Sequence, residues 1–253
     1  MNRNDFEVEI CANSFDSVIE AEKGGANRVE LCDNLCEGGT TPSIGLIELI
    51  KGKTSIDTFI LIRPRGGDFV YNDNETAIMI KDILASVKCG ADGIVIGCLT
   101  RKQEIDYETC SRLIEAAKGL PVTFHRAFDV CRNPVDSLEL LQKLGVSRIL
   151  TSGQQNKATE GMELLKKLND LALNKNIKIM AGSGIDENNI TRIAMETNIR
   201  AFHASLGSMV QFPSIDTPVK FNCNPQLPEY NRKISDSTRI ITLINKLKEL
   251  PNA

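Results

Sequence analysis

The chain lacks a strong charge of either sign, a long apolar run and a cationic start. Its 253 residues carry 30 Lys and Arg against 33 Asp and Glu, a net charge of −3. This balance argues against general nucleic-acid binding, which needs clustered cations to neutralise phosphates. The longest apolar runs, such as Ile94–Ile96, are far shorter than the about 20 residues that span a bilayer. Met1–Ile10 is polar and acidic, so we expect no secretory signal and no membrane partner.

Cysteine is sparse and has no metal-motif spacing. The chain holds eight cysteines, and no two of them stand in a C-x-x-C arrangement. Zinc-ribbon and thioredoxin-like sites therefore have no support, and a disulfide scaffold would need a higher density. Without an export signal we expect reduced thiols and a cytoplasmic location. The ordinary role of any one cysteine here is that of a small buried hydrophobe.

The chain does contain a regular alternation of short β-rich segments with longer segments of helical period. Eight segments have strand character, and their starts lie 21 to 35 residues apart, which fits one strand, one helix and two loops. They are Glu7–Ala12, Arg28–Cys32, Thr58–Arg65, Gly93–Leu99, Pro121–Phe128, Arg148–Ser152, Lys178–Gly182 and Ala201–Ser205. Strict alternation of this kind predicts a parallel sheet covered by helices.

Eight such units favour a closed (β/α)₈ TIM barrel over an open doubly wound sheet. An open sheet usually shows a G-x-G-x-x-G turn after its first strand, whereas this chain has Cys11–Ser14 there. No nucleotide or flavin cofactor is therefore indicated. Since no linker interrupts the pattern, we predict a single domain over 1–253. A long proline-containing loop, 206–235, precedes the last helix, and it could be a lid, an oligomer contact or a loose excursion.

Five polar side chains lie in the C-terminal halves of the predicted strands, where barrel enzymes build their active sites. They are Glu30, Arg63, Arg65, His125 and His203. Glu30 and His125 are candidates for acid/base catalysis, and Arg63 with Arg65 for holding an anion. The plainer interpretation is a buried charge network, or side chains that point outward beneath the helices.

Turns after the later strands add backbone donors for an anion. Gly182 and Gly184 follow the seventh strand, and Ser205 ends the eighth, at the places where barrel enzymes often hold a phosphate. Ser152 and Gly153 at the end of the sixth strand complete this candidate anion site. Glycine is also common in the turns that connect helices and strands, without any binding role.

Cys11 and Cys32 end the first two strands, which are neighbours about 5 Å apart in a barrel. If both thiols face inward, they could bind a soft ion such as Cu(I). His203 lies on the other neighbour of the first strand once the barrel closes. Two small buried residues on adjacent strands would, however, need no such explanation.

Several motifs together resemble the CutC family. They are Arg28-Val-Glu-Leu-Cys-Asp33, Glu37-Gly-Gly-Thr-Thr-Pro-Ser43, Ile62-Arg-Pro-Arg-Gly-Gly-Asp-Phe69, Pro121-Val-Thr-Phe-His-Arg-Ala-Phe-Asp129, Leu150-Thr-Ser-Gly153, Gly182-Ser-Gly184 and Phe202-His-Ala-Ser205. The resemblance runs from about Glu7 to Ser208. It implies a cytoplasmic copper homeostasis protein with a (β/α)₈ barrel, a homo-oligomer such as a dimer or tetramer, and Cu(I) bound by Cys11 and Cys32.

Two classes of function stay open at this point. A copper-binding protein would use Cys11 and Cys32, with His203 as a third candidate metal ligand. A protein that only binds copper does not need four such polar residues at a barrel mouth, and the set is typical of an enzyme. They are Glu30, Arg63, Arg65 and His125. The second class is therefore an acid/base barrel enzyme that acts on a small anionic, phosphorylated substrate and is linked to copper only indirectly.

Overall fold

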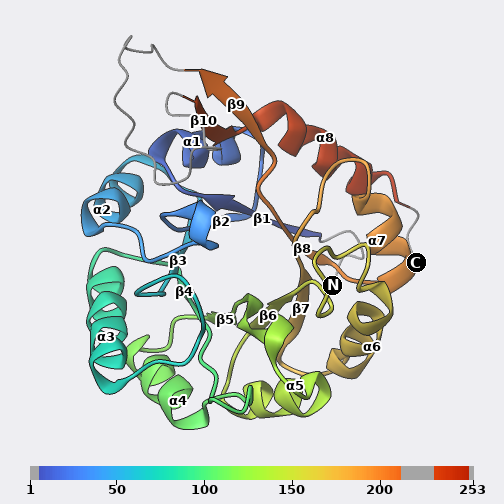
Figure 1. Cartoon of the computed structure of the whole chain (residues 1–253). Helices are drawn as coiled ribbons and strands as arrows, with labels where there is room; N and C mark the ends of the chain where they lie inside the picture. The colour runs from blue at the N-terminus through green and yellow to red at the C-terminus, as the bar shows by residue number, and fades with distance from the viewer. Residues whose placement is uncertain (1–5, 212–230, 251–253) are drawn as a thin grey trace, which may run out of the picture.

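The computed structural model describes residues 6–211 and 231–250, and its first eight strands close into a parallel barrel (Figure 1). These strands are β1 (Glu7–Ala12), β2 (Arg28–Leu31), β3 (Asp57–Leu61), β4 (Gly93–Ile96), β5 (Val122–Phe124), β6 (Arg148–Thr151), β7 (Lys178–Ala181) and β8 (Ala201–Ala204). Each pairs with the next along the chain, and β8 pairs with β1. The predicted (β/α)₈ barrel is confirmed.

A ring of helices surrounds the barrel (Figure 1). Within the described residues these are α1 (Phe15–Lys23), α2 (Ile44–Lys53), α3 (Asp73–Lys88), α4 (Tyr107–Ala116), α5 (Pro134–Lys143), α6 (Met162–Ala172), α7 (Ile190–Thr197) and α8 (Ser237–Lys248). Ser14 and Ser43 cap α1 and α2, and Asn72 with Glu75 forms a capping box at α3. In the described part of the chain, no helix is both long and apolar enough to cross a membrane.

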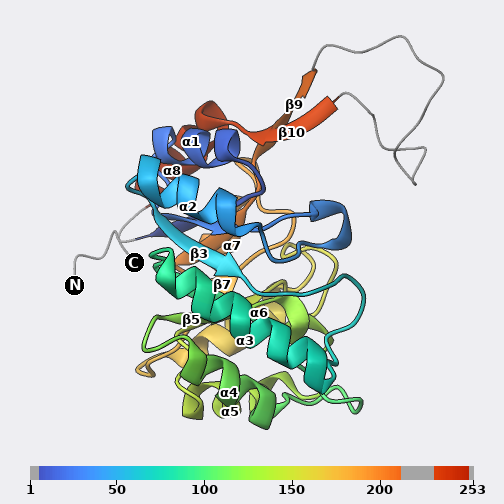
Figure 2. The ribbon, with the colours of Figure 1, turned by 90° about the vertical axis from the view of Figure 1, so that its left-hand side faces the viewer.

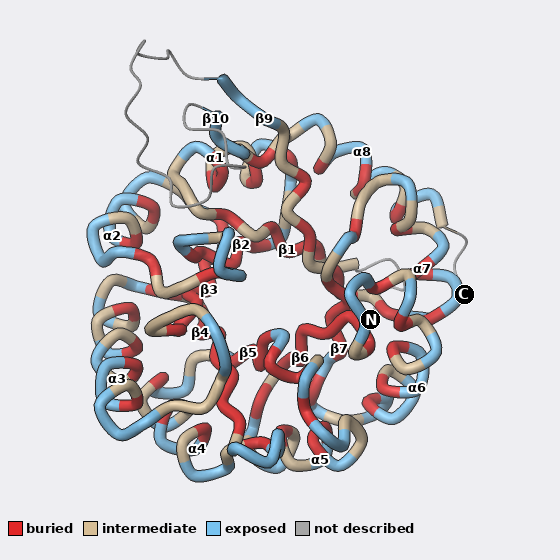
Figure 3. Tube along the Cα trace, viewed as in Figure 1, coloured by how far each residue is buried: buried red, intermediate tan, exposed pale blue. Residues whose placement is uncertain are grey.

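The main hydrophobic core lies between the barrel and the helices. Alternate strand residues supply its inner side, as Val8 and Ile10 do on β1, and helix residues such as Ile47 and Leu165 cover them. Figure 3 shows buried residues on the strands and on the helix faces that turn toward them. The other strand residues therefore point into the barrel, and these residues build the site.

The prediction of a loop over 206–235 is wrong at both ends of this segment, where the structure has strands. Gly207–Gln211 forms β9 and Asn231–Ser235 forms β10, and the two strands pair as an antiparallel ribbon. The ribbon projects away from the barrel beside α1 and α8 (Figure 2). Residues 212–230, with all four of the loop's prolines and Cys223, lie outside the described residues.

Candidate functional site at the mouth of the barrel

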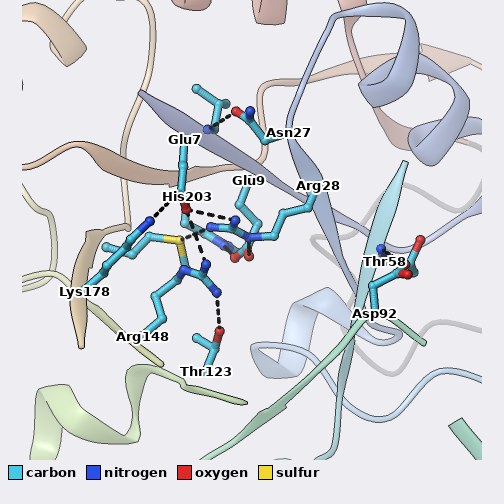
Figure 4. Close-up of polar contacts among 12 residues, drawn as sticks. Glu7, Glu9, Asn27, Arg28, Thr58, Asp92, Thr123, Arg148, Lys178 and His203 are labelled. Atoms are coloured by element: carbon cyan, nitrogen blue, oxygen red, sulfur yellow. Dashed lines mark hydrogen bonds and ion pairs between the residues drawn. The ribbon is translucent and has the colours of Figure 1, made fainter. Parts of the chain in front are cut away.

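A network of ion pairs fills the barrel interior near the starts of the strands (Figure 4). Glu7 on β1 accepts hydrogen bonds from Arg28 at 3.1 Å and Arg148 at 3.3 Å, and also from Lys178. Arg28 Nε donates to Glu9 at 2.6 Å. The charges at the starts of the strands therefore pair with one another inside the barrel.

Opposite charges keep the carboxylates of this network ionised. Burial would raise the pKa of Glu7, but Lys178, Arg28 and Arg148 outweigh that effect and lower it to about 2. Burial also opposes ionisation of Glu9, and the contacts with His203 and Arg28 lower its pKa to about 2 as well. The layer is thus a set of fixed charges that match one another.

Glu9 connects this network to the layer above it. Its side chain is fully buried, with one oxygen on Arg28 and the other 2.7 Å from Nδ1 of His203. Burial disfavours the imidazolium, but the nearby carboxylates of Glu30 and Glu9 and the contact with Cys11 raise the pKa of His203 well above its usual value. His203 is therefore held by an ionised Glu9, which fixes the orientation of its ring.

Above these charges, a cavity of about 110 Å³ opens at the C-terminal mouth of the barrel. The strand-end residues Glu30, Arg63, His125 and His203 all line it together with Cys11. The remaining lining residues are Gly38, Leu61, Phe69, Arg126 and Leu150. The structure therefore brings together the main candidates for both functional classes in one small space.

The thiols of Cys11 and Cys32 lie side by side on β1 and at the end of β2. Their Sγ atoms are 3.7 Å apart, and Sγ of Cys11 lies within 4.8 Å of donor atoms of Glu30 and His203. The hydrogen bond with Cys32, together with burial, raises the pKa of the Cys11 thiol well above its usual value. A metal that binds here must displace protons from the thiols.

The separation of the two sulfur atoms determines what they can do with a metal. With a metal–thiolate bond of about 2.3 Å, two thiolates on opposite sides of an ion stand about 4.6 Å apart. The observed 3.7 Å is shorter, so an ion between Cys11 and Cys32 would have a bent S–metal–S angle and an open side. The group of potential metal ligands within 4.8 Å of one another consists of Cys11, Glu30 and His203, and Cys32 is not part of it.

The carboxyl group of Glu30 is the most perturbed acid of the cavity. It is buried, and one of its oxygens, Oε2, has no hydrogen-bond partner among the described residues. Burial raises its pKa to about 7, with the charge of His203 acting in the opposite direction and that of Glu9 in the same one. A carboxyl group with this pKa exists in both protonation states near neutral pH.

Arg63 and His125 form the wall of the cavity on the β3 and β5 side. Arg63 donates to the carbonyl oxygens of Glu37, Gly39 and Gly67, at 2.6, 2.8 and 2.8 Å. His125 accepts a hydrogen bond at Nδ1 from the backbone N–H of Ala127, 3.0 Å away. Burial and the charge of Arg63 lower the pKa of His125 to about 3, so its ring is neutral at physiological pH.

Arg65 does not share this cavity with Arg63. Its guanidinium pairs with Glu75 at 2.5 Å and Asp68 at 3.0 Å, and it lies over the ring of Tyr71. The expectation that both arginines face the mouth is wrong because β3 ends at Leu61, so regular alternation does not extend through Pro64.

The donors of the turn after β6 find their acceptor in Asp129, which lies in the short 3₁₀ helix Arg126–Val130 after β5. The carboxylate of Asp129 accepts from Ser152 N–H at 3.0 Å and from the Thr151 hydroxyl. Gly153 and Gly182 donate their N–H groups to Thr151 as well. The donors expected at Ser152, Gly153 and Gly182 therefore have partners within the protein.

The remaining members of the candidate anion site lie at the rim. Gly184 is exposed, and the hydroxyl of Ser205 accepts from Lys233 of the ribbon at 3.5 Å. Their role in anion binding stays a prediction. The sequence interpretation missed Phe69, which reaches the cavity from a loop, and Arg126, the first residue of the short 3₁₀ helix Arg126–Val130. Only their place within the family-like motifs could have indicated them.

Comparisons with known proteins agree on one family. The model of the CutC family matches residues 6–208. A CutC family protein of Bacteroides thetaiotaomicron is 44% identical over 246 residues, 96% of this chain and 98% of its own length. The human copper homeostasis protein cutC homolog is 42% identical, covering 95% of this chain and 88% of its own length. A crystal structure of CutC from Streptococcus agalactiae aligns with a TM-score of 0.75 at 40% identity, covering 79% of this chain and 98% of its own.

Proposed function

The chain belongs to the CutC family, and we propose on that basis that it is a copper homeostasis protein that binds Cu(I) at the mouth of its barrel. Relatives from human and mouse carry the name copper homeostasis protein. Reduced thiols in the cytoplasm would keep such a site competent for Cu(I). The homo-oligomeric state implied by the resemblance stays a prediction.

The observation that carries this proposal is the pairing of Cys11 and Cys32. Their sulfur atoms lie 3.7 Å apart, and Cys11 lines the cavity, whereas Cys32 is fully buried and does not line it. Thiolates are soft donors and favour Cu(I) over Mg²⁺, Ca²⁺ or Mn²⁺. Both ligands stand on or beside barrel strands, which hold them more firmly than a loop would.

His203 is the third donor of this proposed site. Since Glu9 occupies its Nδ1, the nitrogen left for a metal is Nε2. A carboxylate behind a ligating histidine fixes the ring and strengthens the ligand. The imidazole would bind the ion on the side that the two thiolates leave open.

The test is a Cu(I) competition titration under anaerobic, reducing conditions. We expect the Cys11→Ser, Cys32→Ser double variant to lose at least about 100-fold in affinity, the upper end of the effect of removing an outer-shell partner. Cys36→Ser is the matched control, because Cys36 is exposed and lies outside the cavity. Parental affinity in the double variant would refute the proposal.

A second candidate function is favoured by the other half of the cavity. Among the described residues, Glu30 Oε2, Arg63 Nε and His125 Nε2 are buried polar atoms without a partner, and all three residues line this cavity. Buried groups of this kind are rare in structures and call for an explanation, such as a bound ligand or water. Tyr71 Oη and Arg148 Nε, whose residues do not line the cavity, share this property. An acid/base enzyme on a small anionic substrate would use the three groups in the cavity, with copper affected indirectly. Saturable turnover of a small anion by metal-free protein would favour this candidate.

A further inference from the structure

We infer that the Arg63 and His125 side of the cavity binds an oxygen of a small carboxylate or phosphate, through the Nε–H of Arg63 and the Nε2–H of His125, which have no hydrogen-bond partner among the described residues. This inference deepens the second candidate function, because it names the group of the substrate that binds. It rests on that function only for the reaction that follows binding. It does not depend on Cu(I), because neither residue belongs to the proposed copper site.

The tautomer of His125 follows from one hydrogen bond. The backbone N–H of Ala127 donates to Nδ1, so this nitrogen carries no proton and acts as the acceptor. In a neutral imidazole the single proton then resides on Nε2. Burial and the charge of Arg63 keep the ring neutral. His125 therefore presents a fixed N–H donor, and its role differs from the acid/base role expected from the sequence.

The position of His125 is built with little freedom. Its ring contacts Phe69, with centroids 5.0 Å apart, and Phe124, at 6.1 Å. A Cβ atom at Gly97 would lie 2.2 Å from its Cε1, so only glycine leaves room for the ring in this place. Despite this tight packing, Nε2 is a buried atom with no partner in the described part of the chain.

Arg63 supplies the second donor and the charge. Three of its five N–H groups donate to carbonyl oxygens, which carry no formal charge, and its buried Nε–H has no partner among the described residues. Its guanidinium lies over Phe69 at 5.0 Å, against the same ring that His125 contacts. An anion in the cavity would match this buried charge.

The chemistry and size of the cavity define the ligand class. Two hydrogen-bond donors without an acceptor, one of them on a cation, favour oxygen atoms that carry negative charge. The volume of about 110 Å³ is below the roughly 300 Å³ at which pockets for drug-sized ligands begin. A single carboxylate or phosphoryl group is the part of a molecule that fits. A fixed neutral imidazole donor beside an arginine can also stabilise negative charge that develops on such an oxygen.

The experiment is a titration of metal-free, ¹⁵N-histidine-labelled protein with acetate and, separately, with inorganic phosphate, followed by NMR. We expect His125 to show a protonated Nε2 and an unprotonated Nδ1 before addition. The Nε2–H signals should then shift saturably with at least one anion. Saturation by acetate alone assigns a carboxylate, and saturation by phosphate alone assigns a phosphoryl group. Absence of a shift, or a linear shift that chloride reproduces at equal ionic strength, overturns the inference.

Matched variants locate the effect. Arg63→Gln should weaken binding at least about ten-fold, as expected for a hydrogen bond to a charged group. Arg65→Gln removes the same charge outside the cavity and should leave binding unchanged. Equal weakening by both variants contradicts the inference. If Arg63→Gln does not fold, the wild-type titration decides the matter.

The Cys32→Ser variant separates this site from the proposed copper site, because Cys32 does not line the cavity. It should weaken Cu(I) binding and keep the oxyanion, so failure of one proposal leaves the other intact. Binding without turnover would likewise support the inference while contradicting the enzyme candidate.

Discussion

Glu9 joins two parts of the barrel interior that have different tasks. One oxygen neutralises Arg28 in the ion-pair network, and the other holds His203 at the mouth. Both contacts are made by a fully buried carboxylate, where each is worth more than on the surface. We therefore expect a single substitution at this position to affect both the stability of the barrel and the proposed copper site.

We expect Glu9→Gln to lower the free energy of unfolding by about 3 kcal/mol, because Arg28 then loses one of its buried partners. Cu(I) affinity of the folded protein should fall about 10- to 100-fold, since the histidine ligand loses the carboxylate behind it. Denaturant unfolding and the competition titration measure the two effects. Glu7→Gln is the matched control, because it weakens the same network without touching His203. If Glu9→Gln leaves the Cu(I) affinity unchanged, Glu9 stabilises the fold and does not support the histidine ligand.

Among the elements, the ends of β4 and β5 approach each other unusually closely at the site. Gly97 follows β4, and its missing side chain leaves the space in which the His125 ring lies. A Cβ atom there would also meet Ala127 at 2.8 Å. The contact sets the position of the donor that we assign to the oxyanion site.

Gly97→Ala should lower the free energy of unfolding by about 1–3 kcal/mol, the usual effect of overpacking. It should also abolish the anion-dependent NMR shift of His125, because the ring has to move. Gly52→Ala is the matched control, since Gly52 lies in α2 with no atom within 4 Å of a new Cβ. Helix propensity predicts a gain of about 0.5–1 kcal/mol there. A Gly97→Ala protein as stable as the parent, with the His125 shift intact, would contradict this account.

The barrel itself was predictable because its signals are local. Each strand is a short β-rich run, and period-two alternation correctly places Glu30 and His203 inward. The same rule covers Glu7, Arg28 and Arg148 in the network, although their partners could not be read from one sequence. Alternation fails for Arg65, because β3 ends at Leu61 before Pro64.

Features that depend on long-range contacts were not predictable. β9 and β10 stabilise each other across an intervening segment, and neither contains an apolar run of its own. Phe69 reaches the cavity from a loop and Arg126 from the start of a short 3₁₀ helix, and in neither place does periodicity indicate the direction of the side chain. Ser152 was expected to bind an external anion, and its donors bind Asp129, a residue from the preceding turn. Pairing of this kind is a property of the folded chain.

At the scale of the whole molecule, the barrel interior has a charged layer near the starts of the strands. Apolar side chains lie beyond that layer, and the cavity lies at the C-terminal mouth. Barrel interiors are usually filled by bulky apolar side chains. Here Glu7, at the start of β1, pairs with Arg28, Arg148 and Lys178, which lie at the starts of three other strands. Arg28 and Arg148 both lie over the ring of Phe59. The network thus ties β1, β2, β6 and β7 together inside the barrel, so its stability must depend on the ionisation of Glu7.

We expect Glu7→Gln to lower the free energy of unfolding at pH 7 by about 2–3 kcal/mol, because buried cations lose their shared counter-charge. The folded-state pKa of Glu7 lies near 2, below its ordinary value of 4.5. Its contribution is therefore fully present above pH 4.5 and is lost as the pH falls from there toward 2. Urea unfolding of parent and variant between pH 7 and pH 3 should show the difference constant down to about pH 4.5 and shrinking below it. Glu115→Gln, at an exposed carboxylate on α4, should give no difference at any pH. A Glu7→Gln effect that persists undiminished at pH 3 would mean that packing of this side chain, rather than its charge, stabilises the barrel.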